Sequence, residues 1–228
     1  MESTGNSGPT QQPLAPQGAP ADRLITLWES VVERDPTHSN RYIERFQKMR
    51  EAGADLHGEA RFVDAMLPRE SRILDAGCGP GRIGGELIRR GHHVVGVDVD
   101  PVLITAATQD HPDGMWLHGD LAHLEVLDLV HAHADADDTE GFKAIVCAGN
   151  VMTFLAAGTH RAVLEGFRRH LSPDGRAVVG FGTTRGYDPQ QFFDDAESAG
   201  FSSVQRFATW EMHPYRRDSD FLVAILNP

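Results

Sequence analysis

Basic residues and cysteines are both scarce in this chain of 228 residues. Lysine and arginine number 21 against 33 aspartate and glutamate residues, which gives a formal net charge of −12. Nucleic acids and anionic membrane surfaces are bound by basic faces, so this deficit argues against both kinds of partner. The two cysteines, Cys78 and Cys147, are too few for a disulfide framework and predict small buried side chains in a reducing compartment.

Long apolar runs are missing as well. No stretch of the sequence is apolar and long enough to span a bilayer. Residues 1–21 are rich in Gly, Ser, Pro, Gln and Thr, and they lack the basic start and apolar centre of a signal peptide. This composition predicts a disordered tail. We therefore expect a cytoplasmic protein in which residues 22–228 form a single domain of ordinary size.

Strands and helices alternate along most of the predicted domain. Strands are predicted at 72–75, 93–98, 115–118, 142–148, 176–181, 203–211 and 221–226, with helices at 83–90, after Pro101, at 159–170 and at 189–199. This order predicts an α/β fold, doubly wound around a mostly parallel seven-stranded sheet. The last two strands are expected to pair antiparallel, because the loop between them is too short for a helical crossover. Helical spacing within residues 22–66, broken at 35–37 and ended at Pro68, predicts an N-terminal helical cap.

A glycine-rich turn follows the first predicted strand. Asp75, Gly77, Gly79 and Gly81 stand at every second position, and Gly79, Gly81 and Gly84 also match the dinucleotide fingerprint. Such a turn lets a ligand approach the backbone closely and aims N–H groups at it. A carboxylate just before the glycines would repel a pyrophosphate, but it suits a ligand that carries a cationic amino group.

S-adenosylmethionine is such a ligand, since it carries an ammonium and a sulfonium group and no phosphate. At this turn the chain resembles the class I S-adenosylmethionine-dependent methyltransferases, whose first motif is the same acidic, glycine-alternating turn. The resemblance extends over residues 22–228, and it implies a Rossmann-like sheet that ends in an antiparallel hairpin. It also implies S-adenosylmethionine as the methyl donor and S-adenosylhomocysteine as the product.

In an open α/β sheet, ligands bind beyond the carboxyl ends of the strands. This rule and the resemblance select the same positions. Asp75 is expected to support the amino group of the cofactor. Asp98, which lies 19 positions after Gly79, is expected to accept hydrogen bonds from the ribose hydroxyls. Asp120 is expected to accept from the adenine amino group. The residues expected to bind the cofactor are Asp75, Gly77, Cys78, Gly79, Gly81, Arg82, Asp98, Val99, Asp120, Leu121, Ala148, Gly149, Asn150, Tyr42 and Arg45.

Several of these positions also have a purely structural interpretation. A helix-capping role fits Asp100 better than Asp98, because Asp100 immediately precedes a proline. Asp120 could instead cap a helix, although the cofactor contact is preferred, and Arg45 could form a surface salt bridge instead of meeting the methionine carboxylate. The spacing of Asp98 from the glycines suits NAD as well as S-adenosylmethionine, and it disfavours NADP.

The acceptor is the part of the function that the sequence specifies least. The segment after the fourth predicted strand lacks the Asn-Pro-Pro-Tyr of the methyltransferases that act on nucleic-acid bases and glutamine, which together with the acidic charge favours a small-molecule acceptor. His118, His160 and His213 are conceivable catalytic bases, and none is assigned. The histidines and aspartates of 131–138 invite a metal, but a solvated acidic loop is preferred and no metal is expected. An NAD-dependent oxidoreductase and a non-catalytic S-adenosylmethionine-binding protein remain as alternatives.

Overall fold

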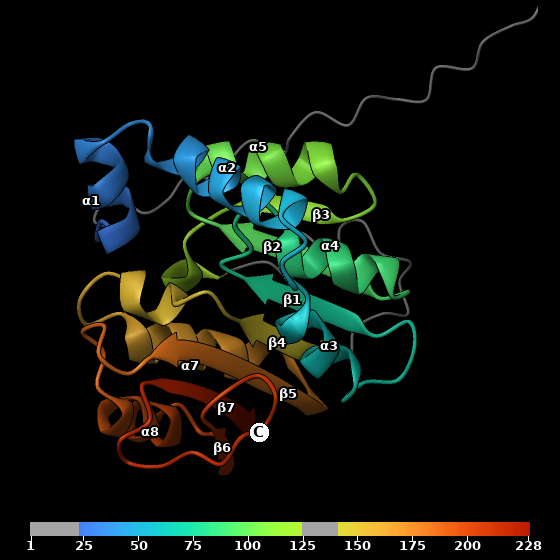
Figure 1. The fold of residues 1–228 in the computed structure, drawn as a ribbon. Helices are drawn as coiled ribbons and strands as arrows, with labels where there is room; N and C mark the ends of the chain where they lie inside the picture. The colour runs from blue at the N-terminus through green and yellow to red at the C-terminus, as the bar shows by residue number, and fades with distance from the viewer. Residues whose placement is uncertain (1–22, 125–140) are drawn as a thin grey trace, which may run out of the picture.

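The computed structural model describes residues 23–124 and 141–228 and contains one seven-stranded sheet (Figure 1). The strand order is β3-β2-β1-β4-β5-β7-β6. β7 runs antiparallel to both of its neighbours, whereas the other adjacent strands are parallel, as the alternation of elements predicted. The strands are β1 (Arg72–Ala76), β2 (His93–Asp98), β3 (Met115–His118), β4 (Phe142–Cys147), β5 (Leu171–Gly182), β6 (Ser203–Phe207) and β7 (Phe221–Asn227).

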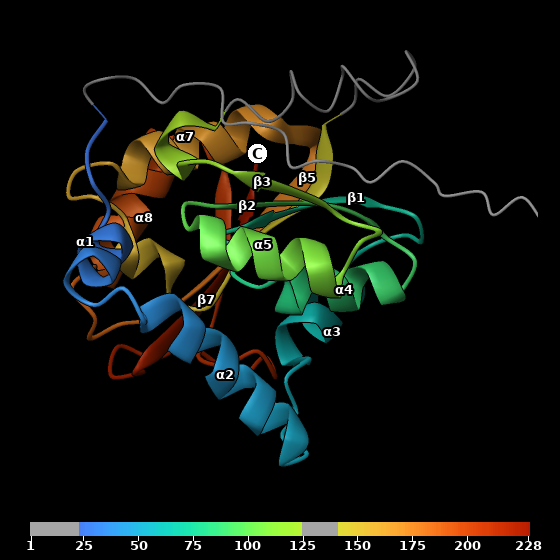
Figure 2. The ribbon, with the colours of Figure 1, turned by 90° about the horizontal axis from the view of Figure 1, so that it is seen from above.

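Helices cover both faces of this sheet, as Figure 2 shows. Buried residues of α3, α4 and α5 pack on one face, and those of α7 and α8 pack on the other. The helices are α1 (Leu27–Arg34), α2 (His38–Glu51), α3 (Gly58–Asp64), α4 (Arg82–Arg89), α5 (Pro101–Asp110), α7 (His160–His170) and α8 (Pro189–Ser198), with short 3-10 turns η1 (Leu121–His123) and η2 (Val151–Phe154). The doubly wound prediction is thereby confirmed.

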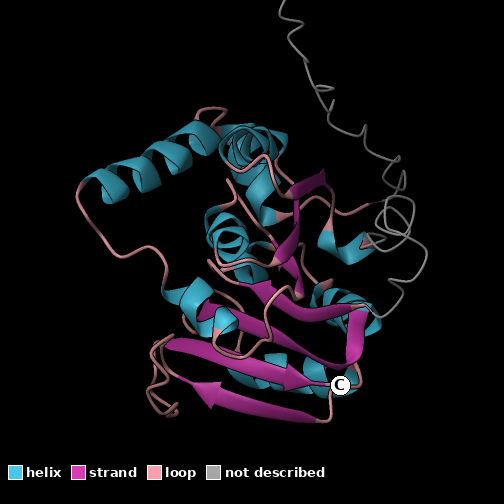
Figure 3. Ribbon diagram, turned by 90° about the vertical axis from the view of Figure 1, so that its right-hand side faces the viewer, coloured by secondary structure: helices cyan, strands magenta, loops and turns pink. Residues whose placement is uncertain are grey.

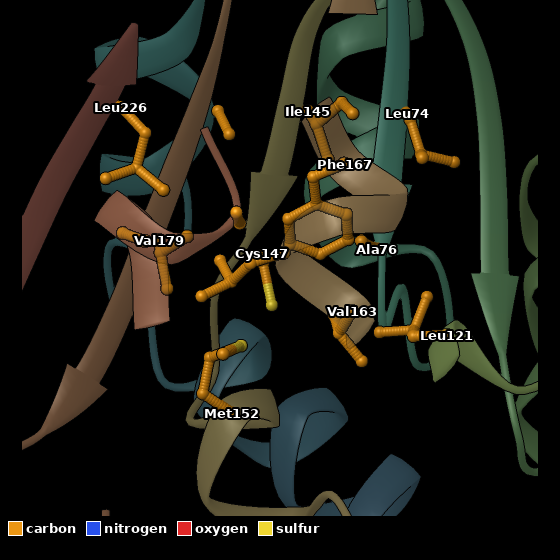
Figure 4. Packing of buried hydrophobic residues seen from close by; sticks show 14 of the residues in the cluster. Leu74, Ala76, Leu121, Ile145, Cys147, Met152, Val163, Phe167, Val179 and Leu226 are labelled. Atoms are coloured by element: carbon orange, nitrogen blue, oxygen red, sulfur yellow. The ribbon is translucent and has the colours of Figure 1, made fainter. Parts of the chain in front are cut away.

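The central strands bury both of their faces, which follows from the alternation of side chains along a strand. In β4, Ala144 and Val146 join the core beneath α3, α4 and α5, whereas Ile145 and Cys147 join the core beneath α7 and α8. Figure 4 shows Phe167 of α7 and Met152 of η2 beside Cys147 in this second core. Met152 is therefore a core residue, and it anchors the turn that follows β4.

Two strand boundaries differ from the prediction by more than one residue. β5 begins at Leu171 because the register against β4 shifts there: Leu171 pairs with Phe142, and Arg176 is the next residue to pair. Residues 173–175 thus form a bulge within the strand. β6 ends at Phe207 because the chain then turns back and places Trp210 over Gly180, where an added Cβ would lie 2.4 Å from the indole ring.

The predicted N-terminal cap separates into two parts. α3 packs on the sheet through Ala60, Phe62 and Val63, whereas α1 and α2 lie across the carboxyl ends of the strands, and α2 runs away from the sheet (Figures 1 and 3). No residue of α1 is buried, and Leu27 is 54% exposed. The apolar pattern that predicted this helix is therefore only partly used for packing.

Two predictions lie outside the described residues, namely the disordered tail over 1–21 and the acidic loop at 131–138. Within the described ranges, no group of three or more His, Cys, Asp or Glu residues is placed to hold a metal ion. No helix in these ranges is long and apolar enough to cross a membrane.

Candidate functional site

A cavity of about 430 Å³ lies beyond the carboxyl ends of the parallel strands, and α1 and α2 contribute to its wall. It brings together most of the residues that the sequence singled out. Those lining it are Tyr42, Arg45, Gly77, Cys78, Gly79, Arg82, Asp98, Val99, Asp120, Leu121, Ala148, Gly149 and Asn150. Asp75 and Gly81 are expected site residues that do not line it. A ligand that reaches all of these positions would touch the ends of β1, β2, β3 and β4.

The glycine turn after β1 needs glycine for two different reasons. Gly77, Gly79 and Gly81 all have positive φ, which side chains rarely adopt. A Cβ on Gly77 would lie 2.3 Å from Val151, and one on Gly81 would lie 2.8 Å from His111, so these two glycines allow close packing. A Cβ on Gly79 would meet only Tyr42, at 3.7 Å. Gly79 is therefore the glycine that leaves room for a ligand.

Asp75 lies behind this turn. It is 1% exposed, and its Oδ2 accepts a hydrogen bond of 2.8 Å from the Gly84 N–H in the first turn of α4. Burial raises the pKa of this carboxyl to about 7. The structure thus gives Asp75 a role in fixing α4 to β1. A direct contact between Asp75 and the amino group of a cofactor remains a prediction. The side chain points to Gly84 and does not line the cavity, so its position does not support that contact.

Asp98, at the end of β2, does face the cavity. Its Oδ2 accepts from the Gly79 N–H at 2.8 Å, and its Oδ1 accepts from the Asp100 N–H at 2.9 Å. These bonds hold the carboxylate in place and leave lone pairs on both oxygens for a ligand. Burial raises the pKa of Asp98 to about 6. Asp98 therefore presents a fixed acceptor pair that titrates close to neutral pH.

Asp120, after β3, combines the two roles that the sequence left open. Its Oδ1 caps η1 by accepting from the Ala122 N–H at 2.9 Å, and the residue also lines the cavity. Its Oδ2 pairs with the guanidinium of Arg23 at 3.1 Å. Arg23 also pairs with Glu29 of α1, so the segment before α1 is tied to the end of β3. The structure shows that Asp120 caps η1. Its contact with the adenine amino group stays a prediction.

The turn after β4 closes the cavity floor. Gly149 and Asn150 both have φ of +69°, which makes Asn150 one of the few non-glycine residues in the left-handed region. The Asn150 side chain compensates, because its Oδ1 accepts a 2.8 Å hydrogen bond from the Gly182 N–H at the end of β5. Asn150 therefore couples the ends of β4 and β5, and Ala148 and Gly149 keep the surface between them free of bulk.

Asp100 anchors the roof of the cavity, which is the name used here for α1 and α2. As expected from the Asp-Pro pair, Asp100 caps α5 by accepting from the N–H groups of Val102 and Leu103. Its other oxygen accepts from the Trp28 indole at 2.8 Å and from the Ser39 hydroxyl. One buried carboxylate thereby joins α1, α2 and α5. Sequence reasoning found the cap and missed the two anchoring bonds.

Tyr42 and Arg45 lie on the cavity face of α2. The Arg45 guanidinium stands 4.9 Å from the centre of the Tyr42 ring and 5.1 Å from that of Phe46. No ion pair of Arg45 is present within the described part of the chain, so the alternative of a surface salt bridge is not observed. Arg82 differs, because it is held by a bidentate ion pair with Glu59. Arg82 is thus a structural cation in the cavity wall, and Arg45 is available to a ligand.

None of the three histidines considered from the sequence lines the cavity. His118 lies 2.9 Å from the Val99 carbonyl, and His160 stacks on Tyr187 at 4.0 Å. His38 lines it instead, with its ring edge-to-face against Trp28 at 5.0 Å. His38 shares a face of α2 with Tyr42 and Arg45, since the spacing is i, i+4 and i+7. That spacing was the signal that would have identified it.

Comparison with known proteins agrees with this geometry. The family model of a methyltransferase domain matches residues 73–175. A crystal structure of a TehB-like SAM-dependent methyltransferase from Corynebacterium glutamicum is 43% identical, with 85% of this chain and 99% of that one covered and a TM-score of 0.75. Streptomyces venezuelae DesVI, at 16% identity and a TM-score of 0.63, covers 84% and 98% of the two chains and shows the fold alone.

Curated relatives are matched over shorter stretches. An uncharacterised methyltransferase of Mycobacterium tuberculosis is 40% identical over 76 residues, which are 32% of this chain and 38% of the relative. A ubiquinone biosynthesis O-methyltransferase of Xylella fastidiosa is 28% identical over 152 residues, or 60% and 57% of the two chains. The chain therefore spans from about two fifths to less than three fifths of the length of these relatives.

Proposed function

Because this chain belongs to the class I S-adenosylmethionine-dependent methyltransferases, we propose that it transfers a methyl group to a small-molecule acceptor inside the described cavity. The shape of that cavity carries the proposal. Its volume of about 430 Å³ lies within the range of small-ligand pockets. Trp28, His38 and Tyr42 line it as well, so α1 and α2 form part of its wall.

The residues present fit S-adenosylmethionine better than a dinucleotide. A pyrophosphate needs free N–H groups at the turn after β1, but the Gly79 N–H is bonded to Asp98 and the Gly84 N–H to Asp75. Two buried carboxylates at this turn would also repel phosphate. Asp98, which lines the cavity, suits a ligand that offers hydroxyl or amino donors and carries positive charge. This chemistry supports the methyltransferase assignment over the NAD-dependent alternative.

The cofactor half of the cavity lies over β1, β2 and β3. Here Asp98 would accept from the ribose hydroxyls, and Asp120 would accept from the adenine amino group beside Leu121. The backbone at Gly79 would lie along the cofactor, since an added Cβ there would point into the cavity. Arg45, held against the Tyr42 ring, would meet the methionine carboxylate.

When bound, S-adenosylmethionine supplies an electrophilic methyl group on a sulfonium sulfur. The chain's own contribution to the reaction is alignment, because fixing the two reactants in line provides much of the acceleration. Gly149 leaves space at the end of β4, and Asn150 holds that turn against β5. His38 stands in the wall as the histidine best placed to take a proton from the acceptor.

Parallel titrations test the cofactor, and a labelled-methyl assay tests the reaction. We expect calorimetry to show micromolar binding of S-adenosylmethionine and S-adenosylhomocysteine and no binding of NAD or NADP. Methyl transfer to a panel of small hydroxyl, amine and thiol compounds should then exceed transfer to total protein or RNA. Faster transfer to a macromolecule would contradict the small-molecule proposal, and binding without any turnover would favour a non-catalytic binding protein.

Asp98 predicts a pH dependence of cofactor binding. Ribose hydroxyls donate to the ionised carboxylate, so binding favours the form that exists above the pKa of about 6. Affinity for S-adenosylhomocysteine should therefore be constant near pH 8 and should fall as the pH drops through 6, by up to about tenfold per pH unit. Calorimetric dissociation constants between about pH 5 and pH 8 measure this.

The Asp98→Ala variant provides the control for this profile. It should bind S-adenosylhomocysteine about 1–3 kcal/mol more weakly at pH 8, because charge-assisted hydrogen bonds are lost. Its affinity should no longer fall as the pH drops through 6. A variant that retains the wild-type pH profile would assign the titration to another group, and one with unchanged affinity would remove Asp98 from the site.

A further inference from the structure

The acceptor half of the cavity is the part that the cofactor residues leave unexplained. The strand order places β2 and β3 on one side of β1, and β4 and β5 on the other. Asp98 and Asp120 therefore lie on one side, and the chain segments that follow β4 and β5 lie on the opposite side. Arg185, three residues beyond the end of β5, reaches the cavity from that opposite side.

The stem of Arg185 is held in a defined place. Its Cδ, Nε and Cγ atoms lie 3.1 to 3.4 Å from the position that a Cβ on Gly182 would occupy. Gly182 thus provides the space across which this side chain packs. The backbone beneath it is fixed as well, because the Gly182 N–H donates to the Asn150 side chain at 2.8 Å. The Arg185 side chain therefore packs on Gly182, whose bond to Asn150 joins the ends of β4 and β5.

The guanidinium of Arg185 is without a partner among the residues at 23–124 and 141–228. It forms no hydrogen bond or ion pair there, and the residue is exposed. Two other arginines in the cavity wall are paired with carboxylates, Arg82 with Glu59 and Arg41 with Asp35. Arg45, which lies against the Tyr42 and Phe46 rings, is the arginine proposed above for the methionine carboxylate. Arg185 is therefore an available cation on the acceptor side.

Negative charge in the described wall lies on the other side. Of the residues that line the cavity, the acidic ones are Asp98 and Asp120, and both follow strands of the cofactor half. Among the described residues of the cavity wall, the segments after β4 and β5 thus contribute the Arg185 cation and no acidic side chain. A guanidinium presents parallel donors that match two oxygens of one carboxylate or phosphate group.

We propose that the methyl acceptor carries an anionic oxygen group, a carboxylate or a phosphate, and that Arg185 binds this group. The proposal rests on the proposed function, because it concerns the acceptor of the same cavity. The anionic group is a handle that serves only to bind the acceptor to Arg185. The methyl group is transferred to an atom of a different group on the same molecule. Trp28 and Phe154, which also line the cavity, favour a planar organic body between the two.

Direct binding tests this without requiring turnover. Protein saturated with S-adenosylhomocysteine is titrated by calorimetry with benzoate, with phenyl phosphate and with the neutral benzamide. Wild-type protein should bind at least one of the anions at least tenfold more tightly than benzamide. Arg185→Gln should lose that tenfold preference, and Arg185→Lys should keep part of it because the charge remains. The stronger of the two anions distinguishes a carboxylate handle from a phosphate handle.

Arg217→Gln is the matched control, since Arg217 is an exposed arginine in a loop and does not line the cavity. It removes the same charge and should leave the binding of every probe unchanged. Affinity for S-adenosylhomocysteine should be the same in all four proteins. Equal binding of the anions and benzamide by the wild type, no binding of either anion, or equal losses in the Arg185 and Arg217 variants would overturn the proposal.

A labelled-methyl assay with paired acceptors keeps this proposal separate from the proposed function. 4-hydroxybenzoate is compared with 4-hydroxybenzamide, and 4-aminobenzoate with 4-aminobenzamide. The acid of a pair should be methylated with at least tenfold higher kcat/KM, and Arg185→Gln should reduce that advantage through KM. Faster methylation of the amides would overturn the anionic handle and leave small-molecule methylation standing. Anion binding by wild type that Arg185→Gln abolishes, without any small-molecule methylation, would count only against the proposed function.

Discussion

Replacing Asp100 by alanine is expected to lower the free energy of unfolding by about 2–4 kcal/mol and to weaken S-adenosylhomocysteine binding at least tenfold. The first effect combines the loss of a helix cap with the loss of buried hydrogen bonds to a charged group. The second arises because Trp28 and Ser39 lose the acceptor that holds the roof over the cavity. Urea unfolding and calorimetry measure the two effects separately.

Asp188 offers a matched control for this substitution. Like Asp100, it caps a helix that begins with proline, and its side chain accepts from the N–H groups of Gln190 and Gln191. Its carboxylate forms no further hydrogen bond or ion pair within the described chain. Asp188→Ala should therefore cost about 1 kcal/mol of stability and leave binding unchanged. Equal effects of the two variants on binding would show that the anchor to α1 and α2 does not matter.

Replacing Gly77 by alanine should be comparably damaging, with a loss of about 2–4 kcal/mol in the free energy of unfolding. The new Cβ would lie 2.3 Å from one γ-carbon of Val151 and 2.7 Å from the other. It would also force a side chain into a φ of +77°. Because Val151 is the first residue of η2 and lines the cavity, the repacking should also disturb the cavity and weaken cofactor binding. Thermal and urea unfolding with parallel calorimetry test this.

Two further variants separate the steric and conformational parts of that loss. Gly91 has a φ of +86°, and an added Cβ there would meet nothing within 4 Å, so Gly91→Ala should cost only about 1 kcal/mol. Adding Val151→Ala to Gly77→Ala should relieve the collision and recover part of the stability. If Gly77→Ala costs no more than Gly91→Ala, close packing against Val151 is not the reason for the glycine.

The sequence predicted well those features that depend on short-range patterns. The alternation of elements predicted the sheet, and the dipeptide Asp100-Pro101 predicted the α5 cap. The glycine turn and Asp98 predicted residues that line the cavity, namely Gly77, Gly79 and Asp98. Asp75 shows the limit of such reasoning: whether a carboxylate faces the cavity or turns back to Gly84 depends on how α4 packs on β1. That packing is set by distant contacts that the motif does not contain.

The acceptor half was harder to predict for a physical reason. Arg185 lies in a loop, where no periodicity marks the direction of a side chain. Its position depends on Gly182 at the end of β5 and on Asn150 in the turn after β4. His38 had a detectable signal in its spacing from Tyr42, but the placement of α1 and α2 over the cavity depends on contacts with distant residues, such as the bonds from Trp28 and Ser39 to Asp100. Residues that meet across separate elements are those that local patterns leave undefined.

The link between Arg23 and Asp120 has a kinetic consequence. These side chains are 20% and 8% exposed, and together with Glu29 they tie the segment before α1 to the end of β3. Any outward movement of the roof from β3 has to separate these charges, and dissolved salt screens the partly exposed ones. Ligand exchange should therefore accelerate as ionic strength rises. If release of S-adenosylhomocysteine limits turnover, moderate salt would increase kcat, and the N-terminal segment would act as the brake.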